Sequence, residues 1–331
     1  MLIGHQKQWQ FLKKSVELEK IPHGILFCGQ EQLGKKTLAI EFAKLLNCSS
    51  SDLKKRPCQT CRNCQDIQKM VYPDFILIKP KGPAFVPLRG TSAGKEIQIS
   101  QIRDLIWKLS LRSYSAPYKI AVLDKAHLMT QEAQSCFLKL LEEPKGRTIL
   151  ILITEYPETL LPTIISRIQK LKFFPVEKTE IENYIISKGI LEKDAKHLAS
   201  ISFGRPGLIA NFLSNSQKLK NQEKLISDLL KISQSDLSSR FKYAKDLIEK
   251  DSDLSYNLSA ILNIWLGYFR NIFLSRFYSS ASNKQTKDDN FNRYSLSKLT
   301  KIISLIQSTN FLLSTTNINP KLAIELLLME L

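Results

Sequence analysis

Residues 24–39 read GILFCGQEQLGKKTLA, and this stretch decides the fold. An apolar run, a glycine-flanked loop and a helical pattern follow one another, which predicts a strand, a loop and a helix. The loop matches most of the phosphate-binding form G-x-x-x-x-G-K-[ST], because Gly29, Gly34 and Lys35 stand at the required positions. In such a loop, backbone N–H groups surround the phosphates and the lysine reaches the terminal ones.

The same loop departs from this form where Mg²⁺ would be held. Lys36, which precedes Thr37, occupies the position of the metal-binding hydroxyl, and Gln32 stands where another glycine is usual. An ammonium group repels a divalent cation instead of ligating it. We therefore expect a degenerate nucleotide site, with neither ATP nor Mg²⁺ as a cofactor of this chain.

A second departure lies about 90 residues further on. Residues 119–124 read KIAVLD, an apolar strand that ends in Asp124, as does the strand that assists Mg²⁺ in ATPases of this type. The next residue in an active enzyme is a glutamate that polarises the attacking water, whereas here it is Lys125. Two independent losses indicate a chain without ATP hydrolysis of its own.

Four cysteines form a compact cluster in the sequence. Cys48, Cys58, Cys61 and Cys64 give the spacing C-x9-C-x2-C-x2-C, which is typical of a tetrahedral zinc site in a reducing compartment. Four thiolates saturate the metal, so the predicted zinc is structural. A chance grouping or a redox pair is the alternative.

The totals describe a folded chain of several domains. The 331 residues are 43% hydrophobic, enough for two or three buried cores, and we expect a cytoplasmic protein because neither a membrane-length apolar run nor a secretion signal is found. The net charge of +17 favours acidic partners such as nucleic acid. Lysines scattered by compositional bias would give the same total, and both interpretations stay open.

Strands and helices alternate in the first half of the chain. Apolar strands are expected at 24–28, 75–79, 119–124 and 148–153, with helices between them. One of these helices is expected over 101–111, capped by Ser100. This order predicts a parallel sheet covered on both faces. Beyond Pro175 the pattern is helical, so we expect domains at 1–174, 175–213 and 214–331.

An ordered series of motifs resembles a known family. The series comprises the loop GQEQLGKKT, the segments LDKAHLMTQEAQSCFLKLLEEP (123–144) and LITEYPETLLPTIISRI (152–168), the turn FGRPG and the closing NINPKLAIELLL. Over essentially its whole length the chain resembles the delta-prime subunits of bacterial DNA polymerase III clamp loaders. The resemblance implies an AAA+ P-loop-type sheet domain with a zinc knuckle, a small helical lid and a helical collar domain that joins subunits.

The resemblance also implies partners and roles. Members load the sliding clamp onto primed DNA as a hetero-pentameric ring, in which delta-prime is a stator beside the delta and gamma/tau subunits of a DNA-directed DNA polymerase holoenzyme. Arg167 matches the arginine finger that acts in trans on a neighbour's ATP, and Thr154 matches the first sensor position. The lid arginine that senses nucleotide would fall near Gly207, from which Arg205 is offset, so lid sensing is not expected.

Two other functions compete with this assignment. One is an ATP-hydrolysing motor subunit of the gamma/tau kind, or another AAA+ ATPase, against which Lys36 and Lys125 argue. The other is a zinc-dependent nucleic-acid-binding protein, for which the cysteine segment lacks the helix-bearing finger pattern and the stacking aromatics.

Overall fold

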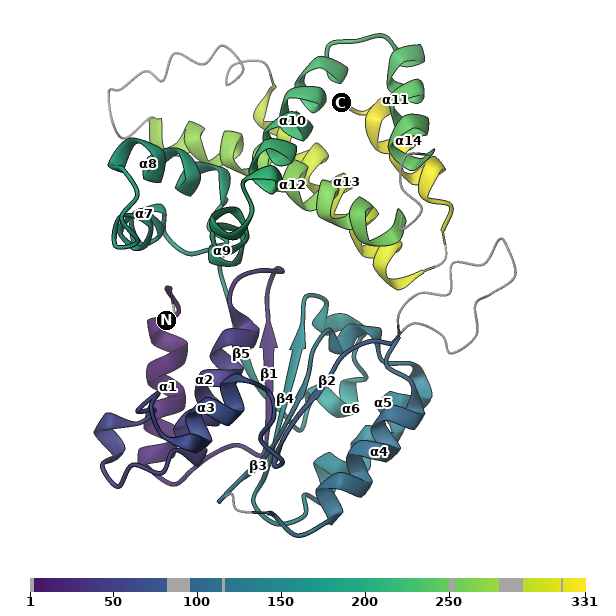
Figure 1. Ribbon diagram of the computed structural model, residues 1–331. Helices are drawn as coiled ribbons and strands as arrows, with labels where there is room; N and C mark the ends of the chain where they lie inside the picture. The colour runs from purple at the N-terminus through teal and green to yellow at the C-terminus, as the bar shows by residue number, and fades with distance from the viewer. Residues whose placement is uncertain (1–2, 82–95, 115–116, 250–253, 280–293, 317) are drawn as a thin grey trace. The chain divides into compact units, whose positions relative to one another are not determined.

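The computed structural model describes residues 3–81, 96–114, 117–249, 254–279, 294–316 and 318–331 (Figure 1). The chain divides into two compact units, Met1–Ile209 and Ala210–Leu331. The first unit holds the sheet and the second is built from helices.

A five-stranded parallel sheet forms the centre of the first unit. Its strands are β1 (Gly24–Cys28), β2 (Phe75–Ile78), β3 (Lys119–Leu123), β4 (Thr148–Thr154) and β5 (Gln169–Lys172), in the order β2-β3-β4-β1-β5. Cys28 lies opposite Thr154 in the pairing of β1 with β4. The carboxyl ends of these strands therefore coincide at the edge where the glycine loop begins.

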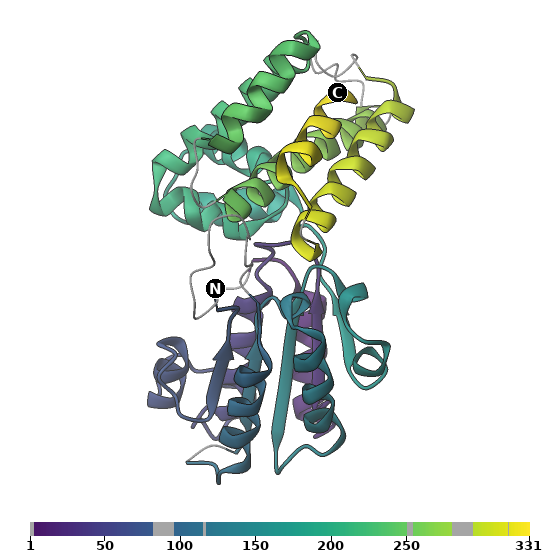
Figure 2. The same cartoon turned by 90° about the vertical axis from the view of Figure 1, so that its right-hand side faces the viewer.

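Alternate side chains of each strand enter two separate cores. Ile25 and Phe27 pack with α1 (Gln6–Glu17) and α2 (Lys35–Asn47), whereas Leu26 and Cys28 pack with α4 (Ile99–Ser110) and α5 (Gln131–Glu142). Because successive strand side chains point to opposite faces, continuous apolar runs require helices on both faces. Figures 1 and 2 show this three-layer arrangement, and the predicted covered parallel sheet is confirmed.

The start of α4 differs from the expected cap. Ser100 was expected to cap a helix beginning at Gln101, but α4 begins at Ile99 and its cap is Gln98. The Gln98 and Gln101 side chains bond reciprocally with each other's backbone N–H in a capping box. This reciprocal pair satisfies two N-terminal donors, whereas a serine alone satisfies one.

Several short helices complete the first unit, two between strands and the others after the last strand. These are α3 (Arg62–Gln68) after the cysteine segment, α6 (Pro162–Ile165) before β5, and then α7 (Lys178–Ile186), α8 (Glu192–Ile201) and α9 (Pro206–Ser214). The boundary between the compact units falls inside α9. The finer division at 174/175 and 213/214 stays a prediction.

The second unit is entirely helical in its described residues. It contains α10 (Ser216–Ile232), α11 (Leu237–Glu249), α12 (Leu254–Ser279), α13 (Leu296–Thr315) and α14 (Pro320–Met329). Its core holds the buried Trp265 and Phe269, and Asn310 of α13 bonds to Asn263 and Ser259 of α12. The predicted combination of an α/β sheet domain with a helical C-terminal region is confirmed. Among the described residues, no helix is both long and apolar enough to cross a membrane.

Candidate nucleotide-like pocket and cysteine cluster

The glycine loop opens onto a pocket at the carboxyl ends of the strands. The pocket has a volume of about 320 Å³, and the residues predicted for the degenerate site are brought together in its lining: Gly34, Lys35, Lys36, Thr37, Asp124, Lys125 and Thr154. Gly29 begins the loop directly after β1 with φ of 150°, and Gly34 precedes α2 with φ of 92°. Both angles favour glycine, because a side chain would strain the backbone there.

Lys35 turns back into its own loop. Its Nζ donates hydrogen bonds to the carbonyl oxygens of Gly29 and Gln30, the latter at 2.7 Å. Burial lowers the pKa of Lys35 to about 8, although the carboxylates of Glu31 and Asp124 act in the opposite direction. The ammonium group is thus bound by backbone oxygens at the place where phosphates would be cradled.

Two ion pairs cross the pocket. Lys36 Nζ lies 3.4 Å from Asp124 Oδ2, as expected if an ammonium group takes the place of the metal. Lys125, which stands where an active enzyme has its glutamate, forms an ion pair of 2.5 Å with Glu31 Oε1. Glu31 was missed by sequence reasoning, although a carboxylate in the middle of a phosphate loop is itself a signal. Its charge repels the phosphates that such a loop would bind.

Thr154 is engaged by neighbours within the pocket. Its Oγ1 lies 3.2 Å from His127 Nδ1 and accepts a hydrogen bond of 3.1 Å from the Tyr156 backbone N–H. Burial, with smaller contributions from Lys125 and Lys35, lowers the pKa of His127 to about 3, so its imidazole is neutral at physiological pH. His127 was not singled out from the sequence because a lone histidine carries no pattern.

The start of α9 closes onto the loop at Gln32. The Gly207 backbone N–H donates a 2.8 Å hydrogen bond to the Gln32 carbonyl oxygen, and a Cβ added to Gly207 would lie only 2.8 Å from that oxygen. Position 207 therefore cannot carry a sensing arginine in this arrangement. Arg205 is buried two residues earlier, which lowers its pKa to about 10.

Arg167 lies at the other end of the sheet from this pocket. It precedes β5, whose first residue Gln169 pairs with Ile25 of β1. Gly29, where the glycine loop begins, follows Ile25 by four residues. At 3.3 Å per residue, the loop therefore begins about 13 Å from Ile25 along the strand. Arg167 Nη2 contacts Glu142 Oε1 at 3.0 Å, and Nη1 donates to the Thr163 carbonyl oxygen at 3.1 Å. The structure does not bring Arg167 to the chain's own nucleotide-like pocket.

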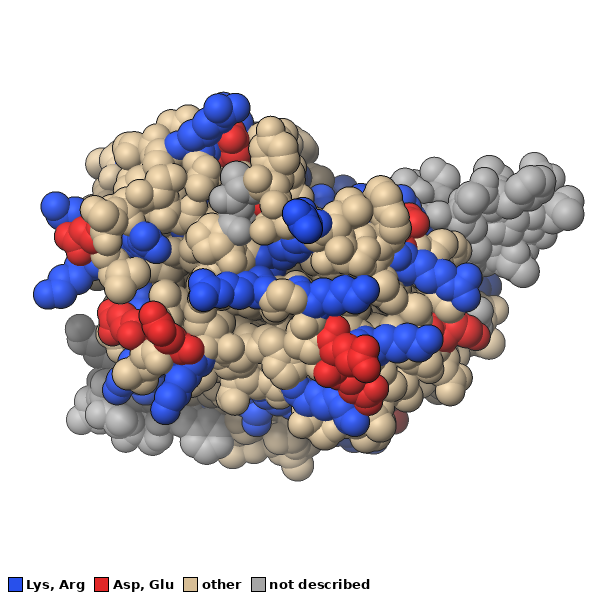
Figure 3. All heavy atoms as spheres, turned by 90° about the horizontal axis from the view of Figure 1, so that it is seen from below, with Lys and Arg blue, Asp and Glu red and all other residues tan. Residues whose placement is uncertain are grey.

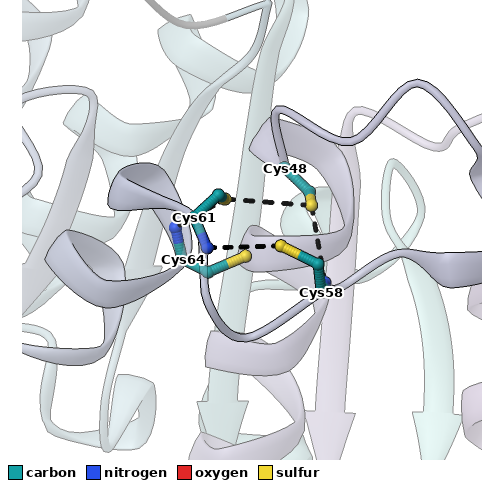
Figure 4. A group of neighbouring side chains, drawn as sticks. All are labelled: Cys48, Cys58, Cys61 and Cys64. Atoms are coloured by element: carbon teal, nitrogen blue, oxygen red, sulfur yellow. Dashed lines mark hydrogen bonds between the residues drawn. The ribbon is translucent and has the colours of Figure 1, made fainter.

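The four cysteines converge between the end of α2 and α3 (Figure 4). Their Sγ atoms all lie within 4.8 Å of one another, and those of Cys48 and Cys61 are 3.9 Å apart. Zn–S bonds of 2.3 Å in a tetrahedron place sulfur atoms about 3.8 Å apart. The four sulfur atoms therefore fit a tetrahedral metal site if the longer distances between them shorten slightly.

Backbone donors around the cluster favour thiolates. The N–H groups of Cys58, Cys61 and Cys64 point at the sulfur atoms of Cys48, Cys58 and Cys61 at 3.3–3.5 Å. The hydrogen bond from Cys61 is the largest of the effects that lower the pKa of Cys58 to about 6. Burial raises the pKa of Cys64, a penalty that a bound cation would offset. These residues could hold a metal ion.

The family is decided by comparison with known proteins. The family model described as "DNA polymerase III, delta subunit" matches residues 4–177, more than half of the chain. The chain belongs to this family. The resemblance to delta-prime subunits is confirmed, because the DNA polymerase III subunit delta' of Bacillus subtilis is 34% identical over 193 residues, 58% of this chain and 54% of that protein.

Two further relatives include another subunit type. The delta' subunit of Pseudomonas aeruginosa is 33% identical over 44% of this chain and 41% of its own length. The DNA polymerase III subunit gamma of Buchnera aphidicola subsp. Schizaphis graminum is 28% identical over 76% of this chain and 67% of its own. The matched segments span about half the length of the delta' relatives.

Proposed function

We propose that this chain is the delta-prime stator of a DNA polymerase III clamp loader and helps to load a sliding clamp onto primed DNA. The observation that carries the proposal is the pair of ion pairs in its nucleotide-like pocket, Lys36–Asp124 and Lys125–Glu31. They support a subunit that holds its shape over one that turns over ATP.

Each ion pair removes a different part of the ATPase apparatus. The Lys36 ammonium neutralises the carboxylate that would assist Mg²⁺, so a divalent cation meets a positive charge there. The Lys125 ammonium cannot accept a proton from an attacking water and is held by Glu31 in the loop. We infer that the chain has no intrinsic ATP hydrolysis, although it serves a DNA-directed DNA polymerase holoenzyme.

The place of Arg167 supports action on a neighbouring subunit. It lies at the end of the sheet away from its own pocket and is 40% exposed, so a partner's phosphates could reach it. A guanidinium can bridge two phosphate oxygens in a forked geometry. The partners under this proposal are delta and gamma/tau subunits in a five-membered ring, joined through the helical second unit as a collar.

The cysteine cluster holds one structural zinc ion under this proposal. Four protein thiolates leave no open coordination position, so the metal provides no reactive water. The metal would join Cys48, buried at the end of α2, and Cys64, buried in α3, to the half-buried Cys58 and Cys61 between them. Lys44 of α2 supports the same segment through a hydrogen bond to the Gln59 side chain, and it also donates to Glu41 of its own helix.

The gamma relative favours a second candidate, the ATP-hydrolysing motor subunit. Binding and turnover of Mg-ATP by the isolated chain separate the two functions. The stator should show no turnover, and the double substitution Lys36→Thr with Lys125→Glu should increase Mg-ATP affinity at least tenfold, about 1.4 kcal/mol. Lys188→Thr with Lys193→Glu, at exposed positions in the turn after α7 and in α8, is a matched control. Turnover by the wild-type chain would favour the motor subunit, and wild-type binding of Mg-ATP as tight as that of the double mutant would show that the two lysines do not disable the site.

A further inference from the structure

A positively charged groove lies at the end of the sheet where the strands begin, opposite the nucleotide-like pocket. It is a hollow of about 440 Å³ whose charged lining residues are Arg112, Lys119, Lys145 and Arg147. No acidic residue is among those described in that lining. A second hollow of about 310 Å³, whose lining includes one acidic residue, Glu19, shares Arg147 and Gly146 with it, and the two together are here called the basal groove.

Figure 3 views the molecule from this end. Blue Lys and Arg side chains run in a band across the middle of the face, and the red acidic side chains gather in separate groups beside it. Such a band attracts an extended anion more strongly than scattered lysines do, because the charges add along its length.

The floor of the groove is built from buried groups. Lys119 is buried, and its Nζ donates hydrogen bonds to the carbonyl oxygens of Leu109, at 3.2 Å, and Leu111. These carbonyls end α4, so the lysine places a fixed positive charge at the end of that helix. The groove is therefore a rigid feature of the fold.

Contacts to Tyr118 and Asn47 fix the wall of the groove at Arg147. The Arg147 guanidinium lies 5.7 Å from the centre of the Tyr118 ring. The Tyr118 backbone exchanges two hydrogen bonds with the buried Asn47 side chain, at 3.1 and 3.2 Å. Arg112 and Lys145 are exposed, and among the described contacts neither has a carboxylate partner. Their charges remain available to a ligand.

Exposed aromatic rings lie on the chain segments that adjoin the groove's lining residues. Trp107 is 62% exposed and lies one helical turn before Leu111, which lines the groove. Tyr114 is 82% exposed, and its backbone N–H is held at 3.0 Å by the buried carboxylate of Asp74. Exposed rings on the segments that adjoin the groove provide faces on which nucleobases stack.

We propose that the basal groove binds single-stranded nucleic acid. Arg112, Lys145 and Arg147 neutralise successive phosphates along the groove, and Trp107 and Tyr114 stack with bases. A strand with one charge per nucleotide matches an elongated line of cations, and unpaired bases are free to meet the rings. An acidic protein surface needs no stacking faces. This inference is independent of the proposed function.

The test measures binding of a fluorescent 20-nucleotide oligothymidylate to the zinc-loaded chain by anisotropy over a range of salt concentrations. The double substitution Arg112→Ala with Lys145→Ala should weaken binding and reduce the slope of log K against log salt by about 1.4, since each phosphate contact on a single strand contributes about 0.7. Lys188→Ala with Lys193→Ala removes the same charge from exposed positions in the turn after α7 and in α8, and should leave the slope closer to that of wild type. Circular dichroism confirms folding of each variant.

A second substitution separates stacking from charge. Trp107→Phe should retain single-strand binding, whereas Trp107→Ala should weaken it about tenfold and leave binding to a 20-base-pair duplex unchanged. The proposal is overturned if the oligonucleotide does not bind, if both charge variants change the slope equally, or if Trp107→Ala has no effect. Competition by polyglutamate at the same charge concentration as the oligonucleotide would instead identify an acidic protein as the partner and overturn it as well.

Discussion

The guanidinium of Arg167 is paired with the carboxylate of Glu142 at 3.0 Å, across the ends of two different elements, α5 and the turn before β5. The side chains are 40% and 51% exposed. Ion pairs this exposed contribute at most about 1 kcal/mol. The pair therefore keeps Arg167 oriented but can open when a stronger anion arrives.

If Arg167 acts in trans as proposed, replacing it with alanine should leave the chain folded and reduce ATP turnover of an assembled clamp loader by about 10³- to 10⁵-fold, the range found for arginine fingers. Arg167→Lys should not restore turnover, because an ammonium lacks the forked donors. Steady-state ATPase assays of the reconstituted complex measure the loss. Arg103→Ala, an exposed arginine of α4, is the control. Normal turnover with Arg167→Ala would reject the finger.

Replacing Glu142 with glutamine should raise that turnover by up to about fivefold, since it removes a competitor worth at most about 1 kcal/mol for the guanidinium. The increase should vanish in an Arg167→Ala background, where there is no guanidinium to release. Glu143→Gln changes the neighbouring exposed carboxylate and serves as the control. An equal effect in both backgrounds would show that Glu142 acts on something other than Arg167.

Lys35 should make folding stability depend on pH in a defined window. Burial lowers its pKa from 10.5 to about 8 in the native state, so the unfolded chain binds more protons between these values. Stability should consequently rise as pH increases from 8 to 10.5, by up to about 3 kcal/mol. Urea unfolding at pH 7 and pH 10.5 measures the change in the free energy of unfolding, and Lys35→Met should remove this rise. The exposed Lys193→Met should keep it, and a rise that survives in Lys35→Met would contradict the assignment.

The cysteine cluster should bind one equivalent of zinc. Acidification should release the metal, because protonated thiols are poor ligands. Cys58→Ser should lower zinc content and loosen residues 48–64 while leaving the sheet folded, as measured by metal analysis and hydrogen exchange. Cys136→Ser, outside the cluster, should retain the metal. Less than half an equivalent in carefully purified wild-type protein would rule the site out.

Local patterns in the sequence were enough to identify several features. Apolar runs predicted β1, β3 and β4, because a strand buried on both faces needs no distant information to be recognised. The replacement residues Lys36 and Lys125 stand at fixed offsets from the motifs that they interrupt. Cysteine spacing likewise predicted a cluster whose members lie within 17 residues of one another. Each of these signals is short in sequence.

Only the tertiary structure decided which distant groups meet. The pairing of Lys125 with Glu31, the hydrogen bond from Gly207 to Gln32, and the meeting of Arg147 with Tyr118 each join segments from different parts of the chain. The first and third of these contacts follow from the strand order β2-β3-β4-β1-β5, which places β4 between β3 and β1, whereas the second depends on the packing of α9 against the glycine loop. Hydrophobic periodicity records which face of a strand is buried but not which strand lies beside it. The sequence alone therefore determined the elements and the altered motif positions, whereas sheet order and register determined the ion pairs, the remote place of Arg167 and the basal groove.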